Sequence, residues 1–238
     1  MREGMEKRKK RRIRSEEEEN ADRITDNEKI VEHWVPKTAV GKKVKNSEIT
    51  SLEELFEKNY VMMEPEIFDA LVAKPLEKLV DFKKTTRVTR QGRNFSFRAT
   101  VLVGDGEQFI GVGIGKDKER FPAIRKAARN AKLDLVRIRK GAGSWESAAT
   151  SGASLPFRVA GKSASVRVEL MPAPEGTGLV VGEAIKDVMR FAGVKNVWSK
   201  TSGNTRSKLD FVKAAVGALA NTTKMRISKD IETKFRRV

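Results

Sequence analysis

The sequence predicts an α+β chain with two folded domains. Between residues 94 and 103, apolar side chains fall on odd positions and polar ones lie between them up to Thr100, which is typical of a half-buried strand. Residues 124–138 carry apolar side chains at helical spacing. Residues 155–219 then change repeatedly between strand and helix patterns. Both halves of the chain are therefore expected to contain sheet and helix.

Composition divides the chain into an arm, two domains, a linker and a tail. The segments are 1–50, 51–140, 141–154, 155–221 and 222–238. The arm has eight basic residues in its first fourteen, followed by a run of glutamates, and such charge blocks favour either a solvated tail or folding against phosphate. We expect the stretch from His33 to Lys45 to be extended, with Trp34 as an aromatic anchor. Small residues mark the linker, and basic residues mark the C-terminal tail.

Two helices are predicted before the first sheet. Ser51 and Glu54 match a capping box, in which the hydroxyl accepts a backbone hydrogen bond. Pro65 opens a second helix, and Pro75 ends or kinks it because proline lacks the amide donor. We expect the apolar side chains that follow to cover the sheet: Leu76, Leu79 and Val80.

Residues 86–115 predict three antiparallel strands. The first, around Arg87, leads into a turn at Gln91–Arg93, and a second turn at Gly104–Gly106 separates the other two strands. In the third strand, glycine alternates with isoleucine and valine from Ile110 to Gly115. One face of that strand is almost bare, so that another surface can approach it closely.

A strongly basic helix follows the strands. Its apolar stripe is Ile124, Ala127, Ala128, Ala131, Leu135 and Ile138. A second stripe is basic: Arg125, Arg129, Lys132 and Arg139, with Lys126 at its edge. Residues 116–140 contain ten basic residues against three acidic ones, which indicates a surface that faces phosphate rather than an ordinary solvated helix. Helix, three strands and helix is the order found in double-stranded-RNA-binding domains.

The second domain is predicted to alternate strands and helices. A hairpin joins residues 155–160 to residues 165–170 around Gly161–Ser163, and a helix over 182–192 stops at Gly193. A strand over 194–198 follows. Asn204 or Thr205 then caps a last helix with the apolar stripe Leu209, Val212, Val216 and Leu219.

The charge of the chain indicates a polyanionic partner. The net charge is +17 and the isoelectric point is near 10.1, so nucleic acid is favoured over an anionic membrane. No apolar run has the length of a membrane span, and the first residues lack the charged-then-apolar pattern of a signal peptide, so we expect none. The absence of cysteine excludes disulfides and cysteine nucleophiles, and it is compatible with a reducing cytosol.

Glycine-rich stretches raise the alternative of a phosphate-transferring enzyme. Residues 111–116 end in Gly-Lys, but Ile110 and Asp117 stand where a phosphate-binding loop needs glycine and a hydroxyl residue. Gly176, Gly178 and Gly182 miss the dinucleotide spacing by one residue, which favours a tight turn into a helix. No paired carboxylates mark acid–base chemistry. We expect no catalytic residue, metal or cofactor.

Phe95 and Phe97 lie between basic residues, as aromatic residues do where bases stack on exposed rings. They also share the parity of Ala99 and Val101. We therefore expect both rings in the core, with RNA recognised by shape and phosphate.

Several motifs resemble the small-subunit ribosomal protein S-five family. In the first domain these are Gly92–Ala99, Val103–Gly106, Gly111–Lys116 and Ala123–Ala127. In the second domain they are Met171–Gly178 and Phe191–Val194. The likeness runs in order from about residue 82 to residue 219, and the N-terminal arm is closer to the archaeal or eukaryotic branch.

This resemblance implies a double-stranded-RNA-binding-like first domain and a C-terminal α/β domain with a left-handed crossover. It also implies a cytoplasmic structural protein of the small ribosomal subunit, with partners in small-subunit rRNA, neighbouring ribosomal proteins and messenger RNA near its entrance channel, and roles in assembly and decoding accuracy. A free-standing regulator that binds double-stranded RNA is the other alternative. The residues expected at RNA are Arg87, Arg90, Gly92, Arg93, Lys116, Lys118, Arg120, Arg125, Lys126, Arg129 and Lys132. Those expected at a protein interface are Glu175, Gly176, Thr177, Gly178 and Lys186.

Overall fold

The structure is a computed structural model that describes residues 34–72, 74–146 and 152–224. It divides into two compact units, residues 1–75 and residues 76–238, and each is described by itself. Within the described residues, no helix is both long and apolar enough to cross a membrane. His33, most of the arm, the centre of the linker and most of the basic tail lie outside the described residues.

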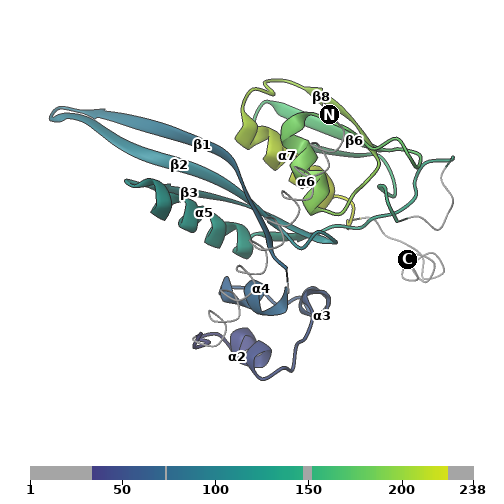
Figure 1. Cartoon of the computed structure of the whole chain (residues 1–238), viewed down its shortest axis with the longest axis horizontal. Helices are drawn as coiled ribbons and strands as arrows, with labels where there is room; N and C mark the ends of the chain where they lie inside the picture. Colours follow the sequence, from purple (N-terminus) through teal and green to yellow (C-terminus); the bar gives the residue numbers. More distant parts are fainter. Residues whose placement is uncertain (1–33, 73, 147–151, 225–238) are drawn as a thin grey trace, which may run out of the picture. The chain divides into compact units, whose positions relative to one another are not determined.

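The first unit is a small helical module (Figure 1). It contains α2 (Ala39–Lys45), α3 (Leu52–Glu57) and α4 (Glu66–Leu71). The extended arm predicted up to Lys45 is therefore wrong for α2, which begins where the Thr38 side chain accepts a hydrogen bond from the Gly41 amide. The predicted cap at Ser51 is confirmed, since its hydroxyl accepts from the Glu54 amide at 3.3 Å. Trp34 is buried in this unit, as an anchor should be.

Glu64 ties the start of this module to the segment before α4. One carboxylate oxygen accepts from Trp34 Nε1 at 2.8 Å, and the other accepts from the Thr38 and Lys37 amides at 2.6 and 3.0 Å. Partial burial raises the pKa of Glu64, but these hydrogen bonds outweigh it and hold the pKa below its ordinary value of 4.5.

The second unit begins with an antiparallel sheet in the order β1-β2-β3-β4. Its strands are β1 (Leu76–Thr89), β2 (Gly92–Gly104), β3 (Phe109–Asp117) and the short β4 (Leu135–Arg137). The prediction that Leu76, Leu79 and Val80 cover the sheet is wrong, because these residues form the start of its first strand. That strand is irregular between Leu79 and Asp81, where one extra residue shifts the register with β2.

Helix α5 (Arg120–Leu133) lies against one face of this sheet (Figure 1). A Cβ built on Gly111, Gly113 or Gly115 would stand 2.1–2.2 Å from the backbone of α5 at Ala131, Ala127 or Ala123 respectively. The close approach predicted from these glycines is confirmed. The helix is shorter than predicted, because Leu135 belongs to β4 and Ile138 and Arg139 follow that strand.

The C-terminal half forms a second sheet in the order β5-β6-β8-β7. Its elements are β5 (Val159–Ser163), β6 (Val166–Pro172), β7 (Leu179–Val180), α6 (Glu183–Phe191), β8 (Val197–Ser202) and α7 (Lys208–Ala220). Strands β7 and β8 are parallel neighbours joined through α6. The left-handedness of that crossover stays a prediction.

Three details of this half differ from the prediction. The β5–β6 turn lies at Ala164 rather than at Gly161, which is inside β5. Gly161 instead lets α7 pack closely on that strand, because a Cβ on Gly161 would stand 2.1 Å from the Ala214 carbonyl. The strand predicted at 194–198 begins at Val197, and α7 begins after Ser207 rather than after Asn204 or Thr205. The helix over 182–192 and the left-handed Gly193 (φ 67°) are confirmed.

The face of the first sheet opposite α5 is buried in a core shared with the second sheet's helices. Leu102 and Ile110 are fully buried there, in one cluster with Val188 of α6 and Val212 of α7. The two halves of this unit are therefore packed as one body.

Candidate nucleic-acid interface

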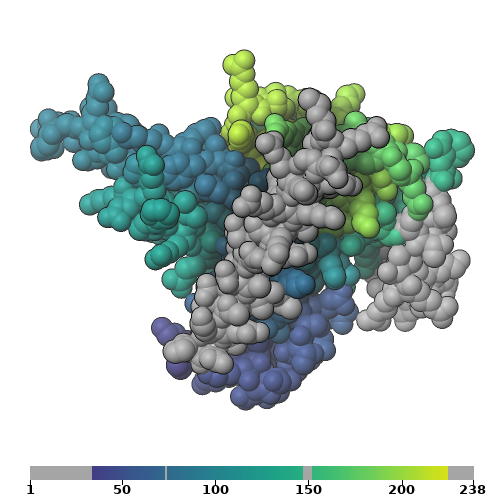
Figure 2. All heavy atoms as spheres, in the orientation of Figure 1, coloured from purple at the N-terminus to yellow at the C-terminus, as the bar shows by residue number. Residues whose placement is uncertain are grey.

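The β1–β2 hairpin extends beyond the rest of its sheet. Strand β3 pairs with β2 only from Phe97 onward, so residues 85–96 form a two-stranded ribbon. Figures 1 and 2 show this ribbon as a narrow projection of the second unit. Residues 82–98 contain six basic residues and no acidic one: Lys83, Lys84, Arg87, Arg90, Arg93 and Arg98. An isolated ribbon of this charge repels itself and attracts a polyanion.

The face of the hairpin that points away from α5 carries a row of cations. Lys83 stands opposite Arg98, and Arg98 stands opposite Lys116, so three strands place like charges side by side. The Lys83 ammonium lies 3.4 Å from a carboxylate oxygen of Asp81. In the described part of the chain, no carboxylate forms a salt bridge with Arg98 or Lys116. Like charges in direct cross-strand positions cost stability unless an anion binds between them.

Sequence reasoning missed Lys83 and Arg98 as members of this surface. Alternation with apolar neighbours placed Arg98 only on the polar face of a strand, and no pattern singled out Lys83. The alignment with Lys116 depends on the strand register, which no local pattern carries.

The tip of the hairpin holds the predicted turn residues. Arg87, Arg90 and Arg93 are exposed. Gly92 has a φ of 126° with no atom within 4 Å of a built Cβ, and its carbonyl accepts from the Thr89 hydroxyl at 3.0 Å. This turn therefore presents arginines on a tight, hydrogen-bonded loop.

Helix α5 presents a second set of cations. Arg120, Arg125, Lys126 and Arg129 are exposed, as are Lys116 and Lys118 before the helix. Lys132 differs, because its side chain is mostly buried and its ammonium lies 2.8 Å from a Glu77 carboxylate oxygen on β1. Lys132 therefore clamps the helix to the sheet, and its expected place at RNA remains an untested prediction.

The predicted core position holds only in part for Phe97 and is wrong for Phe95. Phe97 is half-buried and stacked on Phe82 with ring centroids 5.6 Å apart. Phe95 is 47% exposed, and the Lys84 ammonium lies 3.7 Å from its ring centroid. Phe95 does lie on the same face of β2 as Ala99 and Val101, but α5 does not extend far enough along the hairpin to bury it.

Four of the residues predicted at a protein interface lie in the loop before β7, and the fifth, Lys186, lies on α6. Gly176 and Gly178 have φ of 84° and 71° with open space at a built Cβ. The Gly178 amide donates to the Asn196 side chain at 3.0 Å, which anchors the loop to the start of β8. Glu175 is exposed, while Thr177 and Lys186 are half-buried.

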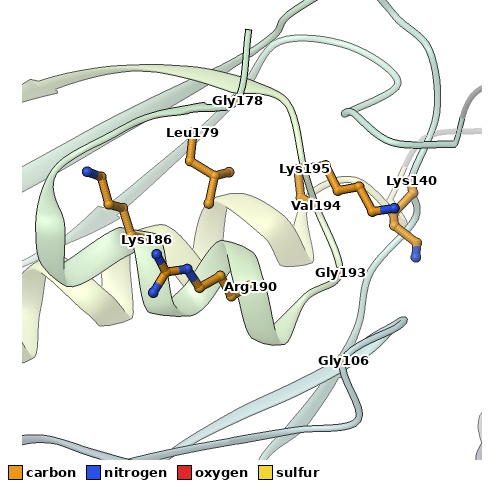
Figure 3. A pocket seen from close by; sticks show the side chains of 9 residues that line it. All are labelled: Gly106, Lys140, Gly178, Leu179, Lys186, Arg190, Gly193, Val194 and Lys195. Carbon is orange, nitrogen blue, oxygen red and sulfur yellow. The ribbon is translucent and has the colours of Figure 1, made fainter. Parts of the chain in front are cut away.

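A groove of about 690 Å³ is lined by Gly178, by Lys186 and by three further cationic side chains. Figure 3 shows Lys186 and Arg190 along α6, with Lys140 and Lys195 toward the other end. The turn at Gly106 closes one side, and its amide donates to the Phe191 carbonyl at 3.1 Å. Asp187 lies beside the groove and contacts Lys78 at 2.7 Å and Arg190 at 3.6 Å. The groove is thus strongly positive.

Comparison with known proteins matches both halves of the second unit. The family "Ribosomal protein S5, N-terminal domain" matches residues 76–139, and "Ribosomal protein S5, C-terminal domain" matches residues 161–234. These matches cover both basic surfaces and the residues that line the groove, except Lys140.

Curated relatives extend the match over most of the chain. Small ribosomal subunit protein uS5 of Staphylothermus marinus is 48% identical over 194 residues, which are 82% of this chain and 91% of that protein. The proteins of the same name from Hyperthermus butylicus and Methanococcus maripaludis are 47% and 46% identical over 82% and 80% of this chain, and over 92% and 84% of their own lengths. At this identity and coverage, the chain belongs to the family of small ribosomal subunit protein uS5.

Proposed function

We propose that this protein is a structural component of the small ribosomal subunit and binds small-subunit rRNA through the β1–β2 hairpin and α5. The observation that carries the proposal is the hairpin, in which residues 82–98 hold six cations and no acidic residue, and residues 85–96 have no third strand beside them. Phosphates bound between these cations would lower their mutual repulsion. The names of the curated relatives support the same assignment.

The cationic row gives this proposal a geometric basis. Lys83, Arg98 and Lys116 lie on adjacent strands, which are separated by about 4.8 Å in a sheet. Closely spaced cations of this kind match the closely spaced charges of a nucleic acid backbone. Binding therefore depends on phosphate position more than on base sequence.

The test is a salt titration of the full chain with a structured fragment of small-subunit rRNA. Affinity is expected to fall about a thousandfold between low and physiological salt, because each neutralised phosphate releases counterions. The double variant Arg90→Ala/Arg93→Ala is expected to bind more weakly, with a smaller salt slope and an unchanged thermal unfolding curve. The same variant should enter small subunits less efficiently.

A variant with the same loss of charge provides the control. Lys208→Ala/Lys213→Ala removes two exposed cations from α7 and is expected to change the affinity and the slope less. Equal losses in both variants would mean that net charge alone drives binding. A flat salt titration of the unmodified chain would overturn the proposal.

The groove and the loop at Glu175–Gly178 support a second contact, with a neighbouring ribosomal protein. Four cations line the groove, so the neighbour would present carboxylates there. The resemblance further favours a position near the messenger RNA channel, a cytoplasmic location and a non-catalytic role in assembly and decoding accuracy. Crosslinking of messenger RNA that carries 4-thiouridine to assembled subunits tests the position near the channel.

A further inference from the structure

Phe95 presents one open aromatic ring on the ribbon. The side chains on its face are Arg93 and Phe97 along β2, with Thr86 opposite and Lys84 and Val88 diagonal to it on β1. Lys84 lies over the Phe95 ring at 3.7 Å from the centroid. A cation at that distance is held by the charge distribution of the ring. The residue as a whole is 47% exposed, so part of the ring stays open to a partner.

The next ring along the strand is already occupied. Phe97 stacks on Phe82, and the Arg120 guanidinium lies 5.5 Å from the Phe97 ring centroid. The first contact joins the two strands of the hairpin, and the second joins β2 to the first turn of α5. Phe95 lies two residues nearer the tip, where neither α5 nor β3 provides a cover.

The surroundings of Phe95 decide between classes of partner. An apolar protein surface placed on this ring would also cover Lys84 and Arg93, and residues 82–98 offer no carboxylate to neutralise them. An RNA strand satisfies both needs, since it carries a flat apolar base and a phosphate within one nucleotide. Bases inside a duplex are already stacked on their neighbours, so the matching base is unpaired.

We infer that Phe95 is a stacking platform for an unpaired nucleotide of RNA, with Lys84 and Arg93 placed to hold the adjoining phosphates. This inference rests on the proposed RNA-binding function and narrows it from duplex shape to single-stranded bases at this point of the hairpin.

The experiment uses the full chain and two RNA hairpins that differ only in one loop-proximal nucleotide, which is unpaired 5-iodouridine in one and paired in the other. Irradiation at long wavelength links this base to an aromatic ring that stacks on it. The expected result is a crosslink to the peptide that contains Phe95, with the unpaired base alone. Phe95→Leu should lose the crosslink and about tenfold in affinity for the unpaired RNA.

Two further variants separate stacking from folding. Phe95→Tyr keeps a flat ring and is expected to retain both affinity and crosslink. Phe121→Leu removes another exposed phenylalanine, 75% exposed on α5, and is expected to change neither. The salt slope should be the same for Phe95→Leu and the unmodified chain, because no charge is lost.

The outcomes also distinguish this inference from the proposed function. If the unmodified chain binds RNA with steep salt dependence but Phe95→Leu binds the unpaired RNA as tightly as the unmodified chain does, the stacking platform is wrong and the phosphate surface stands. An equal loss for the paired and unpaired RNAs would likewise overturn the stacking role. If the unmodified chain shows no salt-dependent binding, the proposed function itself fails.

Discussion

Three glycine residues of β3 set the distance between the first sheet and α5. A Cβ on Gly113 would lie 2.1 Å from the Ala127 carbonyl oxygen and 2.2 Å from the Ala131 amide nitrogen. Both are backbone atoms, so the helix as a whole would have to move. We expect Gly113→Ala to lower the free energy of unfolding by about 3 kcal/mol or more, as measured by urea denaturation.

Gly217 in α7 provides the matched control. It is inside a helix, and a built Cβ there meets no atom within 4 Å. Gly217→Ala is therefore expected to raise the free energy of unfolding by about 0.5 to 1 kcal/mol, because alanine loses less backbone freedom on folding. Equal effects of the two substitutions would contradict the close-packing argument for Gly113.

Glu64 makes the helical module of the first unit sensitive to acid. Its pKa in the folded protein lies below the ordinary value of 4.5, so its stabilising contribution is present above 4.5 and is lost as the pH falls through the lower folded value. We expect acid to loosen Trp34 from Glu64. With Trp145 and Trp198 replaced by phenylalanine, the fluorescence of Trp34 alone should report this change.

Glu64→Gln is the control for that titration. It removes the ionisable group but keeps the side-chain length, so it should weaken the module at neutral pH and abolish the acid-dependent step. If the fluorescence step persists in Glu64→Gln, another group is responsible.

At the scale of elements, sequence patterns predicted β2, β3 and α6 because each has one dominant period. They failed for the start of β1, where Leu76, Leu79 and Val80 have the spacing i, i+3, i+4 of a helix. Leu76 and Leu79 pair with Gly104 and Val101 and therefore lie on opposite faces of the strand, and the register shift follows between Leu79 and Asp81. A bulge adds one residue to the alternation, and no local signal distinguishes it from a helical turn.

The candidate site was predictable in part for a related reason. Arg90 and Arg93 were found because a glycine turn and its charges are local in sequence. The groove was not found as a unit, since Lys140, Lys186 and Lys195 meet only through the packing of α6 against the β2–β3 turn. The exposure of Phe95 depends on where α5 and β3 stop, which strand parity cannot show.

The loop before β7 offers a test of the proposed protein interface. Gly178→Asp places a carboxylate among the cations of the groove, where it competes with an acidic neighbour. We expect RNA binding by the hairpin to stay nearly unchanged while misreading rises in a translating extract that contains the variant ribosomes.

Gly178→Asn separates charge from backbone strain in that experiment. Asparagine has almost the same size, and it tolerates a φ of 71° about as well as any residue other than glycine. It should raise misreading much less than the aspartate does. Normal accuracy with fully incorporated Gly178→Asp protein would count against the interface.

At the scale of the whole second unit, the shared core predicts cooperative unfolding of both sheets. Ile110 belongs to the first sheet and is fully buried against the helices of the second. We expect Ile110→Ala to cost about 2 to 5 kcal/mol, and the loss should appear at Trp198 in β8. Urea unfolding followed by the fluorescence of Trp198 in a Trp34→Phe/Trp145→Phe background measures it.

The milder Ile110→Val should shift the same transition by about 0.5 to 1.5 kcal/mol. A Trp198 transition that stays in place while circular dichroism shows earlier loss of the first sheet would mean that the two halves unfold separately.

The shared core also imposes a waiting time on the newly made chain. The three long strands of the first sheet end at Asp117, but the helix that finishes covering the sheet's second face ends at Ala220, about 100 residues later. At about 5 to 20 residues per second, that apolar face stays uncovered for about 5 to 20 s during synthesis. A chain of this design has to be kept from aggregating for that interval, and a pause in translation before α7 would lengthen its exposure.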